Sequence, residues 1–266
     1  MTLLLKWIPF LNVPLELLGA LGRWCRFVWA AVTWSFQPPY RWRSWFCQMQ
    51  FIGVQSLPII MLTGLFTGMV FALQTGKTFA IFKMQNLVGS TVALALAREI
   101  APVFTALMVT ARAGSAMAAE IGTMKVTEQI DALRTMAVDP LQYLVTPRVI
   151  ACIFMVPLLT IVFNYIGCLG AYVVGTTLLD IPSGPFLRHL YWYLDPDDIF
   201  GGLIKAAVFG FFLATVSCYK GFRTEGGAEG VGRATTSAVV ASSVTILVVD
   251  YFLTTWILEF FTSHRH

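Results

Sequence analysis

The stretch VIACIFMVPLLTIVFNYIGCLGAYVVGTTLL, residues 149–179, contains no charged side chain. It is longer than the about 20 residues that an α-helix needs to cross the hydrocarbon core of a bilayer. A second charge-free run, residues 44–76, meets the same criterion. These two runs predict that the chain is an integral membrane protein.

The composition of the whole chain supports this prediction. Of its 266 residues, 57% are apolar and only 12% are charged, against roughly 25% charged residues in a typical soluble domain. Three further apolar runs are each interrupted by one or two ionisable residues. The sequence therefore predicts an all-α membrane protein with five spans, at 44–76, 87–111, 149–179, 199–219 and 234–260.

The N-terminal region, residues 1–43, has a different character. Pro9 and Pro14 break its first apolar run, and Glu16, Arg23 and Arg26 interrupt the next one. Six of the eight tryptophans precede Phe46, and tryptophan favours the membrane–water interface. We expect an amphipathic elbow helix that lies in the headgroup layer. The alternative is a lipid-facing span whose arginines extend to the interface.

The basic residues predict the orientation, because cytoplasmic loops carry an excess of Lys and Arg. Eleven fall on the side predicted to be cytoplasmic: Lys6, Arg23, Arg26, Arg41, Arg43, Lys125, Arg134, Arg148, Lys220, Arg223 and Arg233. Four fall on the other side: Lys77, Lys83, Arg188 and Arg265. Five crossings then place the N-terminus in the cytoplasm and the C-terminus outside. The net charge of +4 follows from this bias and does not indicate nucleic-acid binding.

A polar segment, residues 112–148, separates the second and third spans. Its apolar positions recur at helical spacing: Val126, Ile130, Leu133 and Ala137. This pattern predicts a short amphipathic cytoplasmic helix within 120–140, which Asp139 and Pro140 end. Such a helix is suited to contact a soluble partner. A solvated connector is the alternative.

Several motifs for chemistry are incomplete. Gly76, Lys77 and Thr78 match the end of a phosphate-binding loop, but Phe71 stands where that loop needs a glycine. Gly114 and Ser115 have no general base nearby in the sequence. The five cysteines are scattered singly, without a ligand pattern. We therefore expect no catalytic site, no metal and no cofactor bound by this chain.

Four charged residues lie well inside the predicted spans: Arg98, Glu99, Lys205 and Asp250. Each costs about 2.5 to 3.5 kcal/mol at the middle of a bilayer, so each should face protein, a cavity or another charge. Arg98 and Glu99 diverge by about 100° on a helix, so they should address different partners. Ion pairing between spans is the structural alternative to a functional site.

The end of the first span carries an aromatic face. Its members follow each other at helical spacing: Phe71, Thr75, Thr78, Phe79 and Phe82. This face can either pack against a neighbouring helix or line a pocket that holds lipid.

Three segments in this order resemble the MlaE/YrbE family of ABC-transporter permeases. They are the motif GxxxGMVxxLQ, which begins at Gly64, the polar segment, and GGAEGVGRATTSAVVASS at 226–243. The resemblance covers roughly residues 64–260 and assigns 44–262 as the permease domain. It implies a homodimer in the bacterial inner membrane that moves phospholipid or a related lipid between this membrane and a periplasmic channel formed by an MCE-domain hexamer.

The resemblance also implies further partners and site residues. A separate ABC ATPase subunit would bind ATP and Mg²⁺, often with a STAS-domain protein attached. The helix within 120–140 would dock on the ATPase, with contacts from Glu128, Asp131, Leu133, Arg134 and Met136. The lipid-binding residues would be Phe71, Thr78, Phe79, Phe82, Arg98 and Glu99, where Arg98 would bind a phosphate headgroup. Two other functions are weighed: an ion-coupled secondary transporter in which Glu99 or Asp250 relays protons, and a non-transporting scaffold for the MCE ring.

Overall fold

The computed structural model describes residues 8–35 and 42–263, and the regular secondary structure in these ranges is helical. The α-helices are α1 (Ile8–Ser35), α2 (Trp42–Ile52), α3 (Leu57–Ile81), α4 (Val88–Ala95), α5 (Ala101–Val109), α6 (Ser115–Val126), α7 (Gln129–Thr135), α8 (Thr146–Thr177), α9 (Ser183–Tyr193), α10 (Pro196–Phe222) and α11 (Gly227–Ser263). Single π-helical turns join α4 to α5 and α5 to α6, at Leu96–Ile100 and Thr110–Gly114.

Within the described residues, five segments are long and apolar enough to cross a membrane, which confirms the predicted number of spans. They are Trp42–Ile81, Gln85–Val126, Leu141–Thr177, Pro196–Phe222 and Gly227–Ile257. The second segment is much longer than the predicted 87–111. Its buried face continues through Met117 and Ile121, because a helix need not end where polar residues begin.

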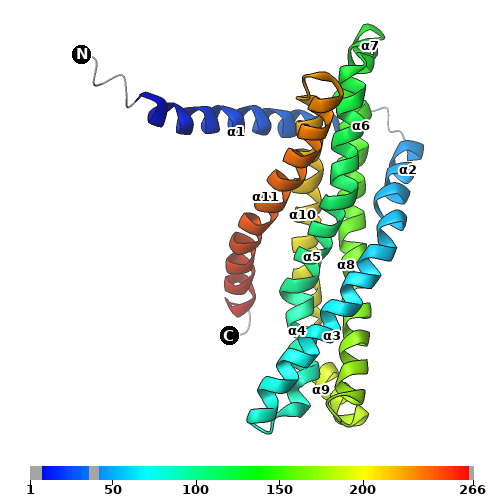
Figure 1. Ribbon diagram of the computed structural model, residues 1–266, viewed down its shortest axis with the longest axis vertical. Helices are drawn as coiled ribbons and strands as arrows, with labels where there is room; N and C mark the ends of the chain where they lie inside the picture. Colours follow the sequence, from blue (N-terminus) through cyan, green and yellow to red (C-terminus); the bar gives the residue numbers. More distant parts are fainter. Residues whose placement is uncertain (1–7, 36–41, 264–266) are drawn as a thin grey trace.

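Figure 1 shows α5, α8 and α10 packed roughly along one axis, with α3 and α11 inclined to them. The end of α6, the short α7 and the turn between α10 and α11 lie at one end of the bundle. The turn between α3 and α4 and the helix α9 lie at the other end. Helix α1 leaves the bundle across its axis, at the end that carries α7. The loops therefore separate into the two groups on which the orientation prediction rests.

Close helix packing explains the glycines of α3. Gly64, Gly68, Ala72 and Gly76 form one buried stripe at intervals of four residues. A Cβ atom at Gly68 would lie 1.9 Å from the carbonyl oxygen of Gly167 on α8. Helices in lipid gain little from hydrophobic burial, so such small residues stabilise the bundle by letting backbones approach. Gly76 also begins the GKT sequence, which therefore lies inside a helix and not in a phosphate-binding loop.

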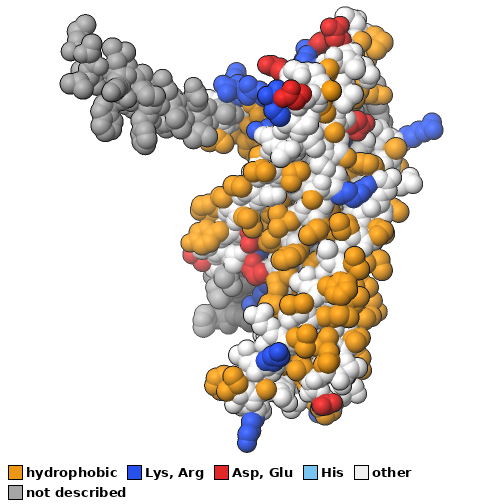
Figure 2. Space-filling model, in the orientation of Figure 1, with side chains coloured by type: hydrophobic (Ala, Val, Ile, Leu, Met, Phe, Trp, Pro, Cys, Tyr) orange, Lys and Arg blue, Asp and Glu red, His pale blue; other side chains and the backbone are white. Residues whose placement is uncertain are grey.

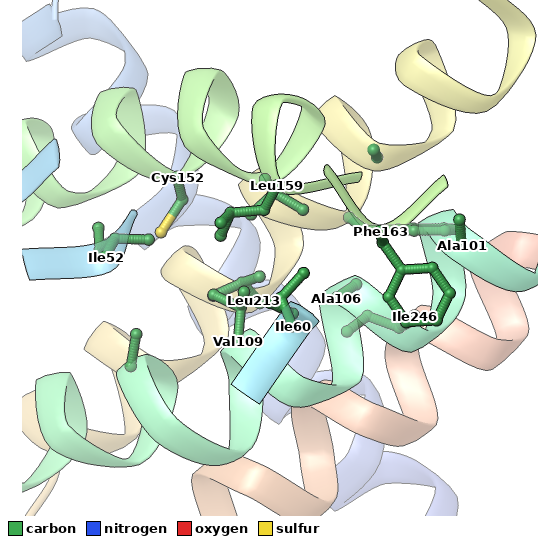
Figure 3. Packing of buried hydrophobic residues seen from close by; sticks show 14 of the residues in the cluster. Ile52, Ile60, Ala101, Ala106, Val109, Cys152, Leu159, Phe163, Leu213 and Ile246 are labelled. Carbon is green, nitrogen blue, oxygen red and sulfur yellow. The ribbon is translucent and has the colours of Figure 1, made fainter. Parts of the chain in front are cut away.

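Large side chains fill the space between the helices where the backbones are further apart. Ile60 of α3, Leu159 of α8 and Leu213 of α10 are buried and converge between these three helices (Figure 3). Phe163 is fully buried and its ring lies 6.3 Å from that of Phe104 on α5. This core fixes α5, α8 and α10, which carry or support the charged residues described below.

Helix α1 contacts the bundle through one face. Trp24 stacks on Phe212 of α10 at 5.9 Å between ring centroids, and Phe27 meets Phe222 edge to face at 5.7 Å. Ala31 continues this face and is buried. Residues 1–7 and 36–41 of the predicted elbow region lie outside the described residues.

The region 120–140 differs from the single amphipathic helix that the sequence predicts. Residues up to Val126 belong to α6, and the chain then turns at Glu128, whose φ of 60° is left-handed. The short α7 follows and ends before Ala137, which has a φ of 57°. Two left-handed residues interrupt the helical hydrogen bonding, so the apolar positions from Val126 to Ala137 do not form one continuous face.

Candidate functional site

A charged network lies inside the membrane-spanning bundle, next to the π-helical turn Leu96–Ile100. Pro102 has no backbone N–H and cannot donate to the carbonyl of Arg98 four residues earlier. The ammonium of Lys205 on α10 donates to this free carbonyl oxygen at 3.2 Å. Irregular helical turns of this kind often mark functional sites. The sequence LAREIAP thus creates a backbone acceptor that a neighbouring helix uses.

Arg98 and Glu99 address different partners, as their spacing predicts. The Nε atom of Arg98 donates to Oδ1 of Asp198 at 2.8 Å, and Nη2 lies 2.7 Å from the same oxygen in an ion pair. Asp198 lies in the first turn of α10 and is buried. Asp198 therefore contacts two nitrogens of the guanidinium group that was predicted to bind a phosphate headgroup.

Lys205 is the centre of the other half of the network. Its side chain is 2% exposed, and its ammonium lies 2.7 Å from Oε2 of Glu99. It also donates to the hydroxyl of Thr254 on α11 at 2.7 Å. Oδ1 of Asp250 lies 3.4 Å away, close enough for an ion pair but outside hydrogen-bond geometry. A buried ammonium at this depth is stable only because these oxygens surround it.

The network is open to the surroundings on one side. The side chain of Glu99 is 43% exposed and that of Arg98 is 38% exposed. Figure 2 shows acidic side chains in the middle of a largely hydrophobic face, where α11 adjoins α5. Arg98 follows the start of α4 by ten residues, which is about 15 Å along a helix. The network thus extends from the first turn of α10, which carries Asp198, inwards to Lys205 on the same helix.

The predicted aromatic face of α3 is partly buried. Phe71 and Phe79 pack against the core of the bundle, whereas Phe82 follows the last residue of α3 and is 66% exposed. The hydroxyl of Thr78 donates to the carbonyl of Gln74 within the same helix. Among the described residues, the hydrogen-bonding partners of Arg98 and Glu99 lie on α10 and α11 and not on α3.

A second charged group lies at the α7 end of the bundle. Asp131 accepts from Lys125 of α6 and from Arg134 of α7, both at 3.0 Å. The hydrogen bond from Lys125 is the main reason why the pKa of Asp131 lies below its usual range. Leu133 packs against the core, while Glu128 and Met136 are exposed. The predicted coupling residues therefore combine an anchored ion pair with an accessible surface.

Two residues of the charged network were not predicted as site residues. Asp198 lies just before the predicted span 199–219, and Thr254 is an ordinary residue of an apolar run. Arg112 is a further omission: it donates to the carbonyl of Phe51 and the hydroxyl of Ser56, both at 2.9 Å. The position of Asp198 next to the start of an apolar run was the one available signal. The contacts of Thr254 with Lys205 and of Arg112 with Phe51 and Ser56 join segments that are far apart in the sequence, so they depend on how the helices pack.

Known proteins resemble the chain over most of its length. The family model "Permease MlaE" matches residues 45–256. A "Probable ABC transporter permease protein" of Rickettsia bellii is 45% identical over 90% of this chain and 93% of its own length.

Two other relatives have more specific names. The "Intermembrane phospholipid transport system permease protein MlaE" of Haemophilus influenzae is 42% identical over 78% of this chain and 80% of its own length. The chloroplastic protein "TRIGALACTOSYLDIACYLGLYCEROL 1" of Arabidopsis thaliana is 39% identical over 82% of this chain and 62% of its own length. These matches confirm the resemblance found in the sequence, and the chain belongs to the MlaE permease family.

Proposed function

We propose that this chain is the membrane-spanning permease subunit of an ABC transporter that moves phospholipid, and that a separate ATPase subunit supplies the energy. The match of the family model to residues 45–256, which include all or most of each of the five spans, carries this proposal. The name of the Haemophilus relative includes intermembrane phospholipid transport. An amphiphile needs a path that offers both apolar and polar contacts, and this chain combines apolar spans with a partly exposed charged network.

The lipid site extends from the outer end of α3 to the charged network. Acyl chains would contact Phe71, Phe79 and Phe82, with Thr78 on the same end of the helix. The headgroup would lie at Arg98 and Glu99. Phe82 is exposed, so it is free to contact lipid. The alternative of an ion-coupled transporter has less support, because Glu99 and Asp250 are both held in ion pairs with Lys205.

The functional unit is a homodimer. Helix α11 supports this proposal because its outward face is a continuous apolar surface. Two shallow hollows follow each other along it. The first is lined by Gly232, Arg233, Thr236, Ser237, Val240 and Ala241, and the second by Val244, Leu247, Val248, Tyr251 and Phe252. Small residues at the first hollow would let a second copy approach closely.

The ATPase would bind at the end that carries α7. The ion pair between Lys125 and Asp131 joins α6 to α7, and the Arg134–Asp131 pair lies within α7. Helix α6 belongs to the same membrane-spanning segment as Arg98. A push on α7 can therefore move a membrane-spanning helix as a rigid body. Exposed Glu128 and Met136 provide a polar contact and an apolar contact.

The remaining partners and the orientation follow from the family and from the distribution of basic residues. The chain lies in the bacterial inner membrane, with the N-terminus in the cytoplasm and the C-terminus in the periplasm. An MCE-domain hexamer would exchange lipid with the chain on the periplasmic side, and a STAS-domain protein would attach to the ATPase. The position of α1 across the bundle axis (Figure 1) supports a place in the cytoplasmic headgroup layer.

The proposal is tested with the chain co-purified with its partner subunits and reconstituted in phospholipid vesicles. We expect an ABC ATPase in the complex, with ATP hydrolysis that depends on phospholipid. Glu128→Lys should reduce both ATPase association and hydrolysis. Arg188→Glu, an exposed charge reversal on α9 at the opposite end of the bundle (Figure 1), is the matched control and should leave both unchanged. A purified complex without an ATPase would refute the proposed function, and full activity of Glu128→Lys would refute the role of α7.

A further inference from the structure

The guanidinium of Arg112 lies where the first span is interrupted between α2 and α3. Its Nη1 donates to the carbonyl of Phe51, in the last turn of α2, and to the hydroxyl of Ser56, both at 2.9 Å. Its Nη2 donates to Oε1 of Gln55. The last carbonyls of a helix lack partners within the helix and favour a nearby cation. The short segment between α2 and α3 therefore holds the guanidinium in one position.

Arg112 has no acidic partner among the described residues. Two other arginines that join helices each have one. Arg98 pairs with Asp198 at 2.7 Å, and Arg148 pairs with Glu120 at 2.8 Å. The acceptors of Arg112 within the described chain are all neutral, so its positive charge is not balanced there. A cation in a membrane span needs a counter-charge, a cavity or a path to the interface.

Two of the five N–H donors of Arg112 remain open. Both hydrogens of Nη1 and one of Nη2 are used within the described chain. The second hydrogen of Nη2 and that of Nε have no acceptor there. Arg112 is partly exposed and its Nε is not enclosed, in contrast to Nε of Arg148, which is buried without a partner. Nε and Nη2 form one edge of the planar guanidinium, and such an edge can bind two oxygens of a phosphate at once.

An exposed apolar stripe on α3 begins one turn beyond Gln55. Its members recur at spacings of three or four residues: Ile59, Leu62, Phe66 and Val70. The stripe is about 16 Å long, which is close to half the thickness of a hydrocarbon core of about 30 Å. An acyl chain of a lipid whose phosphate is bound at Arg112 can therefore lie along this stripe. A free phosphate ion would make no use of it.

We propose that Arg112 binds the phosphate of an anionic phospholipid, in the leaflet on the α7 side of the membrane, at the break between α2 and α3. A lipid with one net negative charge, such as phosphatidylglycerol, neutralises the one positive charge of Arg112. Phosphatidylcholine carries a cation of its own and leaves that charge unbalanced. Basic pockets between spans bind anionic headgroups in this way.

This site is separate from the charged network, because Arg112 lies about 20 Å further along the second span than Arg98. It is an addition to the lipid site of the proposed function, and it requires neither transport nor ATP hydrolysis. The bound lipid would share the guanidinium with the end of α2, so it would strengthen the contact between the first two spans.

Photo-crosslinking with mapping of the labelled residues tests the proposal. The purified full-length chain is placed in nanodiscs of phosphatidylcholine that contain a trace of phosphatidylglycerol or phosphatidylcholine with the same photoactivatable acyl chain. Labelled peptides are identified by mass spectrometry. We expect phosphatidylglycerol to label residues 57–70 about fivefold more than phosphatidylcholine does, which is the contribution of one basic residue to the binding of anionic lipid. Millimolar inorganic phosphate should leave this preference unchanged, because the free ion has no acyl chain.

Gln55→Glu is the most informative variant, because it keeps Arg112 and places a carboxylate beside Nη2. This carboxylate neutralises Arg112 from within the chain, so the two lipids should label residues 57–70 equally. Gln50→Glu is the matched control. It adds the same charge at an exposed position of α2 that forms no hydrogen bond with Arg112, and it should keep most of the preference.

Equal labelling of residues 57–70 by both lipids in the native chain would refute the site. A preference that persists in Gln55→Glu would refute it as well. If millimolar phosphate removes the preference, the ligand is the free ion and the lipid is ruled out. Association with the ATPase and lipid-dependent ATP hydrolysis are measured in the complex, so the failure of this site leaves the proposed function standing.

Discussion

Replacement of Lys205 by Met tests whether the charged network holds the spans together. The methionine keeps most of the buried stem volume but removes an ammonium with four oxygen neighbours, on Arg98, Glu99, Thr254 and Asp250. Removal of one partner of a buried ion pair costs about 3–5 kcal/mol. Glu99 is 43% exposed, and solvent screens its charge, so we expect the lower end, about 3 kcal/mol of unfolding free energy.

The unfolding free energy is measured by titrating the purified chain in mixed micelles with sodium dodecyl sulfate and following its circular dichroism. Lys220→Met, near the end of the same helix, is the control and should change the free energy by less than about 1 kcal/mol. The double variant Lys205→Met with Glu99→Gln should recover about 1 kcal/mol, because one stranded carboxylate is gone. A loss below about 1 kcal/mol in Lys205→Met, or no recovery in the double variant, would refute the view that these ion pairs stabilise the bundle.

Three further predictions concern packing, charge and an interhelical contact. Gly68→Ala should lower the unfolding free energy by about 1–3 kcal/mol, because the added Cβ atom would meet the backbone of Gly167. Gly184 has open space around it, so Gly184→Ala should leave the unfolding free energy unchanged. Equal effects of the two substitutions would contradict the packing argument. The pKa of Asp131 is lowered in the folded chain, so its contribution to stability is present above the unfolded value of about 3.9 and is lost as the pH falls through the folded pKa. The protection factor of the α7 amides, which is the exchange rate of an unstructured peptide divided by the observed rate at the same pH, should therefore fall on acidification in the native chain more than in Asp131→Asn; an equal fall in both would contradict this. Arg112→Met removes the hydrogen bonds to Phe51 and Ser56, so it should loosen the contact between α2 and the second span. Distances between spin labels on these two helices measure this contact. An unchanged distance distribution would show that Arg112 is dispensable there.

The sequence alone predicted the class of the fold and the family. Charge-free runs longer than a bilayer is thick leave few alternatives to membrane-spanning helices, so the five spans could be counted without a structure. It also identified Arg98, Glu99, Lys205 and Asp250 as exceptional, because a charge inside an apolar run has a high free-energy cost. That Arg98 and Glu99 contact different partners followed from the angle of about 100° between adjacent residues of a helix. The headgroup-layer position of α1 and the ATPase contacts of α7 remain predictions.

Only the tertiary structure decided which charges meet. Asp198 and Arg98 are far apart in the chain, and their pairing depends on how the start of α10 packs against the second span. The same holds for Lys205, whose partners come from two other helices. The break at Glu128 also escaped prediction, because its left-handed backbone has no glycine or asparagine to signal it. Apolar length and helical period are local properties of a sequence, whereas the charged network arises from contacts between helices, which depend on the packing of the whole bundle.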